Sequence, residues 1–246
     1  MTTETAATIA MLYPGHAAED DYPLLEKAIG AVRLPVVITE IESDDHTVAA
    51  MRAVGTGDRL VEGARRAAAH RPDVVMWACT SGSFLYGWEG AHAQVADLAT
   101  HTGVPTSSTS LAFAAACRHL GIDSVAIAAT YPEPVAAGFI EFLAGAGVST
   151  AASRAHDIMT ASDAGTLDDA GLVEMVRSSD TPSSQAILVP DTALHTVAAL
   201  TGLERAVGKP VLTANQVTAW HGLRLAGVDP AVGGVGSLFM ATPAHR

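Results

Sequence analysis

The chain has 246 residues, of which 49% are hydrophobic and 16% charged, and its formal net charge is −12. This composition is typical of a compact globular protein with one large domain or two lobes, and it excludes a disordered chain. The 14 Lys and Arg residues are scattered, which excludes nucleic acid and anionic membranes as expected partners; a small anionic substrate stays allowed, because backbone N–H groups can bind a carboxylate locally.

The cysteine and histidine content indicates neither disulfides nor a metal site. Cys79 and Cys117 are too few for a disulfide framework or a cysteine-rich zinc site, and the ten histidines show no metal-ligand spacing. No apolar run reaches the roughly 18 residues of a membrane span, and we see no signal-peptide pattern. We therefore expect a cytoplasmic protein in which Cys79 is a free thiol.

Apolar runs that end in turn-forming residues recur along the chain. They predict strands at residues 8–13, 73–78, 125–129, 186–189 and 211–212. The Ala-rich segments between them have helical spacing at residues 57–70, 89–102, 110–120 and 133–146. Short strands that alternate with helices predict an α/β fold with parallel sheets.

The order of strand ends repeats in the two halves, with Cys79 and Asp191 in equivalent places. This weak internal duplication predicts two similar lobes, one formed by residues 1–112 and 213–246 and the other by residues 113–212. We expect residues 213–225 to pack back on the first lobe. Because ligands bind beyond the carboxyl ends of parallel strands, two facing lobes predict one cleft between them.

The most distinctive local feature is the segment Ala78–Ser83, in which a thiol at a strand end precedes hydroxyl residues and a glycine. Thiolates form more readily beside loops rich in hydrogen-bond donors. The N–H groups of Thr80, Ser81 and Gly82 could also hold a carboxylate or a developing oxyanion. The alternative interpretation is a small buried cysteine in front of a capped helix.

Asp191 follows Pro190 at the second strand end and could act as a general acid or base. Its alternative role is that of an N-cap, because we expect a helix after it, with His195 as a structural residue one turn into that helix. Tyr131 could bind a substrate carboxylate through its phenol or pack at a turn, and Asn215 follows a strand in the same way.

These residues resemble the aspartate/glutamate racemase superfamily, in the branch that contains maleate cis-trans isomerases and arylmalonate decarboxylases. The resemblance covers nearly the whole chain and rests on Leu12–Pro14, Ala78–Ser83, Ala129–Tyr131, the Asp191 strand end and Thr213–Trp220. It implies two pseudosymmetric flavodoxin-like lobes, each a parallel sheet flanked by helices, with the active site in the cleft between them and no cofactor.

The resemblance also implies a small carboxylate or dicarboxylate substrate and a set of residues that touch it. Cys79 and Asp191 are the implied catalytic residues. The implied substrate-binding residues are Pro14, Thr80, Ser81, Gly82, Tyr131, Thr192, Ala193 and Asn215.

The chain departs from each known pattern of the branch. The isomerases and most racemases carry a cysteine at both strand ends, whereas this chain keeps Cys79 and has Asp191 at the second position. The arylmalonate decarboxylases have glycine at the first position and cysteine at the second. Gly15 and His16 stand where the isomerases tend to have serine and asparagine.

Three functions fit these residues. In the favoured one, an isomerase like maleate isomerase, the Cys79 thiolate adds to a small cis-enedioate, the bond rotates, and elimination gives the trans product, with Asp191 as proton donor or electrostatic gate. In the second, a decarboxylase or racemase, Cys79 only moves a proton at the carbon next to a carboxylate. The third is a non-catalytic carboxylate binder. The sequence leaves the oligomeric state open, with a homo-oligomer as one option.

Overall fold

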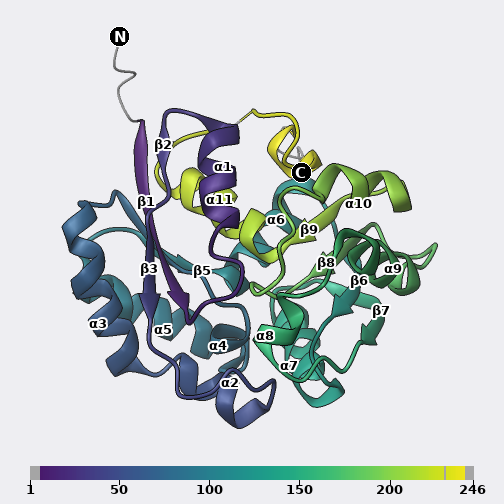
Figure 1. Ribbon diagram of the computed structural model, residues 1–246, viewed down its shortest axis with the longest axis horizontal. Helices are drawn as coiled ribbons and strands as arrows, with labels where there is room; N and C mark the ends of the chain where they lie inside the picture. Colours follow the sequence, from purple (N-terminus) through teal and green to yellow (C-terminus); the bar gives the residue numbers. More distant parts are fainter. Residues whose placement is uncertain (1–5, 230, 242–246) are drawn as a thin grey trace.

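The computed structural model describes residues 6–229 and 231–241, and its strands form two sheets (Figure 1). The first sheet has the order β2-β1-β4-β5, and β3 also pairs with β1; the second has the order β7-β6-β8-β9. All of these pairs are parallel. The strand bounds are β1 Ala7–Pro14, β2 Val32–Arg33, β3 Val36–Thr39, β4 Val74–Trp77, β5 Thr106–Ser108, β6 Ser124–Ala129, β7 Ser149–Ala155, β8 Ala186–Val189 and β9 Val211–Thr213.

Helices connect the strands and cover both sheets. Their bounds are α1 Asp21–Ile29, α2 Val48–Val54, α3 Gly57–Ala67, α4 Ser81–Phe84, α5 Gly87–Thr102, α6 Thr109–Leu120, α7 Glu133–Gly145, α8 Ala161–Ala164, α9 Asp169–Ser179, α10 Leu200–Val207 and α11 Ala214–Leu225, with 3₁₀ turns at Ala68–His70 and Ser237–Phe239. None of these helices is long and apolar enough to cross a membrane in the part of the chain that the structure describes.

The central strands form because their residues are apolar throughout and can be covered on both faces. Every residue of β4 and β8 is buried. One face of the first sheet packs on α3 and α5 through residues such as Leu60 and Leu98, and one face of the second packs on α9 and α10 through Leu172 and Leu203. Continuous apolar runs of this kind are the pattern of parallel strands buried on both sides.

The predicted α/β fold with parallel sheets flanked by helices is confirmed. The predicted strands are present, but the sequence reasoning missed others, among them β2, β3 and β7. The run of β3 is followed by Glu40 and Ile41 and not by turn-forming residues. The strand β7 lies at the edge of its sheet with largely exposed or half-buried residues. Neither therefore gives the apolar run with a turn at its end on which the prediction relied.

Helices α6 and α11 lie between the two sheets (Figure 1). The last helix, α11, contacts α1, β1 and β4 of the first sheet as well as β9 of the second. A hydrogen bond of 2.7 Å joins the hydroxyls of Thr109 and Thr218 in the contact between α6 and α11. The largest buried cluster runs through these helices and includes residues from both halves, such as Met76 and Leu188. The lobe boundaries stay a prediction.

Gly222 permits the close approach of α11 to the first sheet. A Cβ atom added there would lie 2.6 Å from Ile9 Cγ2 and 3.1 Å from Met76 Cγ. We expect Gly222→Ala to lower the free energy of unfolding by about 1–3 kcal/mol, because a methyl group would be forced into a filled core. Urea unfolding monitored by circular dichroism measures this change.

The matched control is Gly202→Ala on α10, where an added Cβ would meet nothing within 4 Å. This substitution should stabilise the protein by up to about 1 kcal/mol through helix propensity alone. Equal effects of the two substitutions would contradict the packing argument.

Candidate active site

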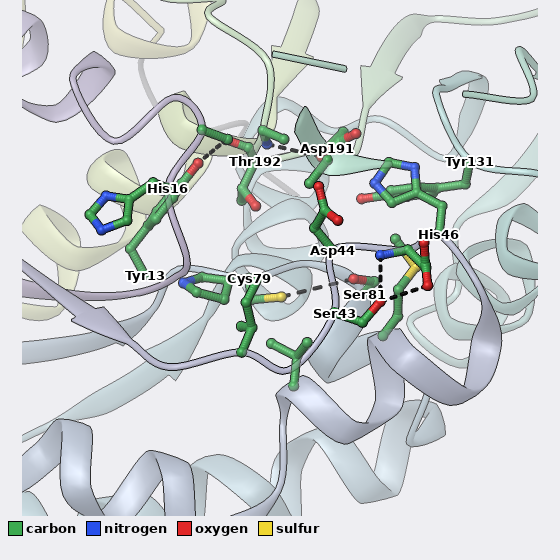
Figure 2. Close-up of a pocket in the computed structure, with 18 residues that line it drawn as sticks. Tyr13, His16, Ser43, Asp44, His46, Cys79, Ser81, Tyr131, Asp191 and Thr192 are labelled. Carbon is green, nitrogen blue, oxygen red and sulfur yellow. Dashed lines mark hydrogen bonds between the residues drawn. The ribbon is translucent and has the colours of Figure 1, made fainter. Parts of the chain in front are cut away.

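The carboxyl ends of strands from both sheets surround one pocket (Figure 2). Pro14 ends β1, Cys79 follows β4, Tyr131 follows β6 and Asp191 follows β8. The space, including its opening to solvent, is about 550 Å³. The residues that line it are Tyr13, Pro14, His16, Ala17, Ile41, Ser43, Asp44, Asp45, His46, Met51, Val54, Cys79, Ser81, Tyr131, Ala161, Asp191, Thr192 and Ala193. The structure therefore brings together most of the residues predicted to form the site.

Cys79 lies in the pocket wall with only 4% of its surface exposed. Its Sγ accepts a hydrogen bond from the Gly82 N–H at 3.3 Å, and the Ser81 hydroxyl oxygen lies 3.9 Å away. Burial raises the pKa of the Cys79 thiol to about 11, although the contacts with Gly82 and Ser81 lower it in part. At neutral pH the pocket therefore presents a protonated thiol.

The glycine of the cysteine segment is needed for this arrangement. A Cβ atom on Gly82 would lie 3.1 Å from both Cys79 Sγ and Trp77 Cζ2. Gly55 approaches from the other side, and a Cβ there would lie 2.1 Å from the Gly82 carbonyl oxygen. Gly82 was predicted to bind substrate. In the structure its N–H donates to the Cys79 sulfur, and Gly82 does not line the pocket.

The hydroxyl groups of the same segment have separate roles. Ser81 lines the pocket next to the thiol. The Ser83 hydroxyl bonds that of Ser108 at 2.9 Å, and Ser110 donates to the Thr80 carbonyl at 2.7 Å, so both tie the segment to the start of α6. Thr80 Oγ1 is buried beside the Tyr131 phenol without a well-aligned hydrogen bond among the described residues. A ligand oxygen would give this hydroxyl a partner.

Asp191 faces the pocket from a loop and not from the start of a helix. Residues 191–199 form turns, and α10 begins only at Leu200, so the helix expected after Asp191 and the helical position of His195 are both wrong. Pro190 and the polar residues that follow favour turns, which the expected helix overlooked. Asp191 Oδ1 accepts from the Ala193 N–H at 2.9 Å, and Oδ2 accepts a short hydrogen bond from Thr130.

The Asp191 carboxylate is thus fixed by donors on two loops, and its negative charge acts on its neighbours. The charge of Asp191 adds to burial in raising the pKa values of the Cys79 thiol and the Tyr131 phenol. Removal of this charge would make the thiolate easier to form.

Tyr131 lines the pocket, and its hydroxyl donates to the Pro190 carbonyl at 2.6 Å. Its ring packs edge-on against the imidazole of His46, with 5.2 Å between ring centroids. Burial is the main reason that the pKa of Tyr131 is raised well above its usual value. The phenol therefore stays protonated and can act as a hydrogen-bond donor or acceptor, but not as a base.

The segment from Ile41 to His46 forms one wall of the pocket and was missed by the sequence reasoning. The His46 Nδ1–H donates to the Ile158 carbonyl at 2.7 Å, so Nδ1 carries the proton. Asp44 Oδ2 accepts from the Ser162 N–H at 3.1 Å and from its hydroxyl at 2.5 Å. These hydrogen bonds lower the pKa of Asp44 and keep its carboxylate ionised.

The polar run Ser43–His46 follows β3 by a few residues. The signal that could have found it was therefore present, because polar residues beyond the end of a parallel strand are candidate ligand contacts. The four-residue run of β3 was not recognised as a strand, so the rule was not applied there.

Asn215, which was predicted to bind substrate, does not line the pocket. Its amide is buried and donates to Asp21 Oδ2 and to the Thr192 carbonyl, both at 3.1 Å. Asp21 is also buried, and its carboxylate accepts from the N–H groups of Thr196 and Val197. Burial raises the pKa of Asp21, and these hydrogen bonds offset part of that rise. The amide and the carboxylate therefore support the 191–197 loop from behind.

Pro14, Thr192 and Ala193 line the pocket as predicted. The Thr192 carbonyl accepts a hydrogen bond from the Tyr13 hydroxyl at 2.8 Å, which joins the end of β1 in the first sheet to the loop after β8 in the second (Figure 2). In the described part of the chain no group of three or more His, Cys, Asp or Glu side chains is arranged to hold a metal ion.

Comparison with known proteins gives two kinds of relative. A family profile described as arylmalonate decarboxylase matches residues 48–239. Arylmalonate decarboxylase of Bordetella bronchiseptica is 31% identical over 172 residues, which cover 69% of this chain and 72% of that protein. Maleate isomerase of Geobacillus stearothermophilus is 26% identical over 174 residues, which cover 68% of this chain and 69% of that protein.

Solved structures of both kinds resemble the chain. A liganded arylmalonate decarboxylase variant, with one glycine changed to cysteine and one cysteine to serine, has a TM-score of 0.82 at 28% identity and covers 95% of this chain and 98% of its own. Nocardia farcinica maleate cis-trans isomerase with a covalently bound succinylcysteine intermediate has a TM-score of 0.87 at 21% identity, with coverage of 95% and 98%, and shows likeness of fold.

The charge on Asp191 gives the first test of the site. We expect Asp191→Asn to lower the pKa of the Cys79 thiol from about 11, because a nearby negative charge no longer opposes the thiolate. A fall of up to about one unit would speed alkylation by iodoacetamide at pH 8 by up to about tenfold. Mass spectrometry assigns the modification to Cys79.

Asp97→Asn is the matched control, because it removes an exposed carboxylate from α5 outside the pocket. Alkylation of Cys79 should keep its rate in this variant. An unchanged rate in Asp191→Asn would contradict the electrostatic coupling of the two groups.

Proposed function

Since this chain belongs to the arylmalonate decarboxylase family, we propose that it removes one carboxylate from a substituted malonate and protonates the remaining α-carbon from Cys79. The observation that carries the proposal is the state of the thiol. Cys79 lies at the pocket wall, and burial raises its pKa to about 11, so it meets the substrate as a neutral acid. A proton donor has to be in this state before the reaction, whereas a nucleophile has to be the thiolate.

The retained carboxylate is held at the end of the cysteine segment. Ser81 lines the pocket with its hydroxyl, and Tyr131 lines it with its phenol. The buried Thr80 hydroxyl lies beside that phenol without a well-aligned hydrogen bond among the described residues. The Ser81 hydroxyl, together with the Thr80 and Tyr131 hydroxyls once they turn from their present neighbours, stabilises the two negative oxygens that develop when the carbon–carbon bond to the leaving carboxylate breaks.

We place the leaving carboxylate against the apolar lining residues Ile41, Met51 and Val54. An ionised carboxylate is poorly solvated by such groups, whereas carbon dioxide is neutral. The electron pair of the broken bond passes to the α-carbon as an enediolate. Cys79 gives its S–H proton to that carbon, and the thiolate that remains regains a proton from water.

A second candidate function is cis-trans isomerisation of an enedioate through addition of the Cys79 thiolate. It is favoured by the Gly82 N–H, which donates to Sγ at 3.3 Å and would stabilise a thiolate. The Geobacillus relative at 26% identity is a maleate isomerase. The two functions differ in the protonation state that Cys79 needs.

Proton NMR in D₂O with phenylmalonate, butylmalonate and, separately, maleate tests the reaction. We expect loss of carbon dioxide from a malonate with one deuterium at the α-carbon of the product, and no fumarate from maleate. Cys79→Ala should lower the rate by about 10²–10⁴-fold, the usual contribution of a general acid.

Cys117→Ala is the matched control, because it removes the other buried thiol, which lies in α6 outside the pocket. Its rate should stay within about twofold of the parent. Fumarate from maleate without decarboxylation of either malonate would support the isomerase instead.

The pH dependence of kcat separates the two states of Cys79. A proton donor with a pKa of about 11 is almost fully protonated from pH 6 to 9.5. Ionisation of Cys79 should therefore leave kcat unchanged over that range. A thiolate nucleophile with the same pKa would give a rate that rises about tenfold per pH unit. A profile with that slope, measured on the enzyme with saturating substrate, would contradict proton donation by Cys79.

A further inference from the structure

The pocket has an acidic wall with little positive charge to balance it. Asp44, Asp45 and Asp191 line it, and no Lys or Arg is among its described lining residues; His16 and His46 are the basic side chains there. Figure 2 shows Asp44 and Asp191 around the same space as Cys79. A doubly negative substrate with an uncharged substituent would find nothing on this wall to neutralise it.

Two of these carboxylates are held in position by hydrogen-bond donors of neighbouring loops. Asp44 Oδ2 takes both of its hydrogen bonds from Ser162. Asp191 is fixed by Thr130 and by the Ala193 N–H. A carboxylate held in place presents its charge to a ligand without further loss of side-chain entropy, so it contributes more to binding than a mobile one.

The acidic wall belongs to a pocket with independent signs of a ligand. The Thr80 side chain is buried beside Tyr131, and its hydroxyl has no well-aligned hydrogen bond among the described residues. Cys79 lines the same space. With a substrate carboxylate beside Ser81, the other substituent of the α-carbon lies in the same pocket as Asp44 and Asp191.

We propose that this substituent carries a positive charge, so that the substrate is a malonate-type acid with an alkylammonium or amidinium side chain. The inference rests on the proposed function, because it takes the retained carboxylate to lie beside Ser81 and Tyr131. It follows from the Asp44 and Asp191 carboxylates that line the pocket and from the lack of Lys and Arg among the described lining residues. The cation would form an ion pair with Asp44 in a partly water-excluded space.

Two ligands of equal size test the proposal, 2-(3-aminopropyl)malonate and 2-butylmalonate, which differ by one ammonium group in place of a methyl group. Their affinities are measured by calorimetry at pH 7 with Cys79→Ala, so that the comparison needs no turnover. We expect the ammonium ligand to bind at least tenfold more tightly, the effect of one close charge pair in a partly exposed site.

Asp44→Asn in the same Cys79→Ala background should reduce this preference to less than threefold. The amide keeps an oxygen that can accept from Ser162, so the loop contact is preserved. The exposed Asp97→Asn substitution removes the same charge from outside the pocket and should leave the preference intact.

Equal affinity of the two ligands, tighter binding of butylmalonate, or binding of neither ligand would overturn the proposal. A preference that survives Asp44→Asn would overturn its assignment to Asp44. Carbon dioxide release by the unmodified protein is measured separately with both ligands. If neither is decarboxylated while the ammonium ligand still binds tightly, the proposed reaction fails and the proposed charge selectivity stands.

Discussion

The close packing around Cys79 is the constraint on which the chemistry of the pocket depends. Gly82 and Gly55 bring two backbone segments so near that a methyl group on either residue would meet an atom at 3.1 Å or less. The sulfur is thereby buried next to Trp77 while still lining the pocket. Because little water can solvate a negative charge there, the thiol stays protonated. The acid that the proposed reaction needs is therefore a consequence of packing.

The charge of Asp191 bears on both the proposed proton donor, Cys79, and the proposed preference for a cationic ligand. Asp191 disfavours the Cys79 thiolate by its charge, and together with Asp44 it would attract a cationic substituent. A neutral thiol at the position of Asp191 would neither disfavour the Cys79 thiolate nor attract a cation at neutral pH. Under the two proposals, a carboxylate in place of a second cysteine would change both the proton donor and the ligand that the pocket favours.

The site is closed on one side by a link between the two sheets. The loop after β3 crosses to the segment before α8, where Asp45 and Thr160 form a β-bridge and the His46 N–H donates to the Met159 carbonyl. The Ala161 N–H donates to the Asp44 carbonyl in the same place. A pocket built from loops of both sheets keeps its shape only while these contacts hold, so they couple the position of Asp44 to the second half of the chain.

The sequence by itself determined the fold class, the central strands and all but one of the strand ends that meet at the pocket, because buried parallel strands need continuous apolar runs and expose their carboxyl ends to ligands. It placed Cys79, Ser81, Tyr131 and Asp191 at such ends. It did not reveal that the Asn215 amide donates to the buried Asp21 carboxylate behind the pocket. A polar residue after a strand gives the same sequence pattern whether its side chain contacts a ligand or a buried carboxylate.

Only the tertiary structure decided the protonation state of Cys79 and the acidic wall. The pKa of a thiol depends on how fully its neighbours exclude water, and those neighbours come from residues far apart in the chain, such as Gly55 and Asp191. Asp44 enters the site through contacts with Ser162, which is 118 residues away in sequence. Local patterns carry no information about such distances, because the folded chain sets them through the packing of the two sheets.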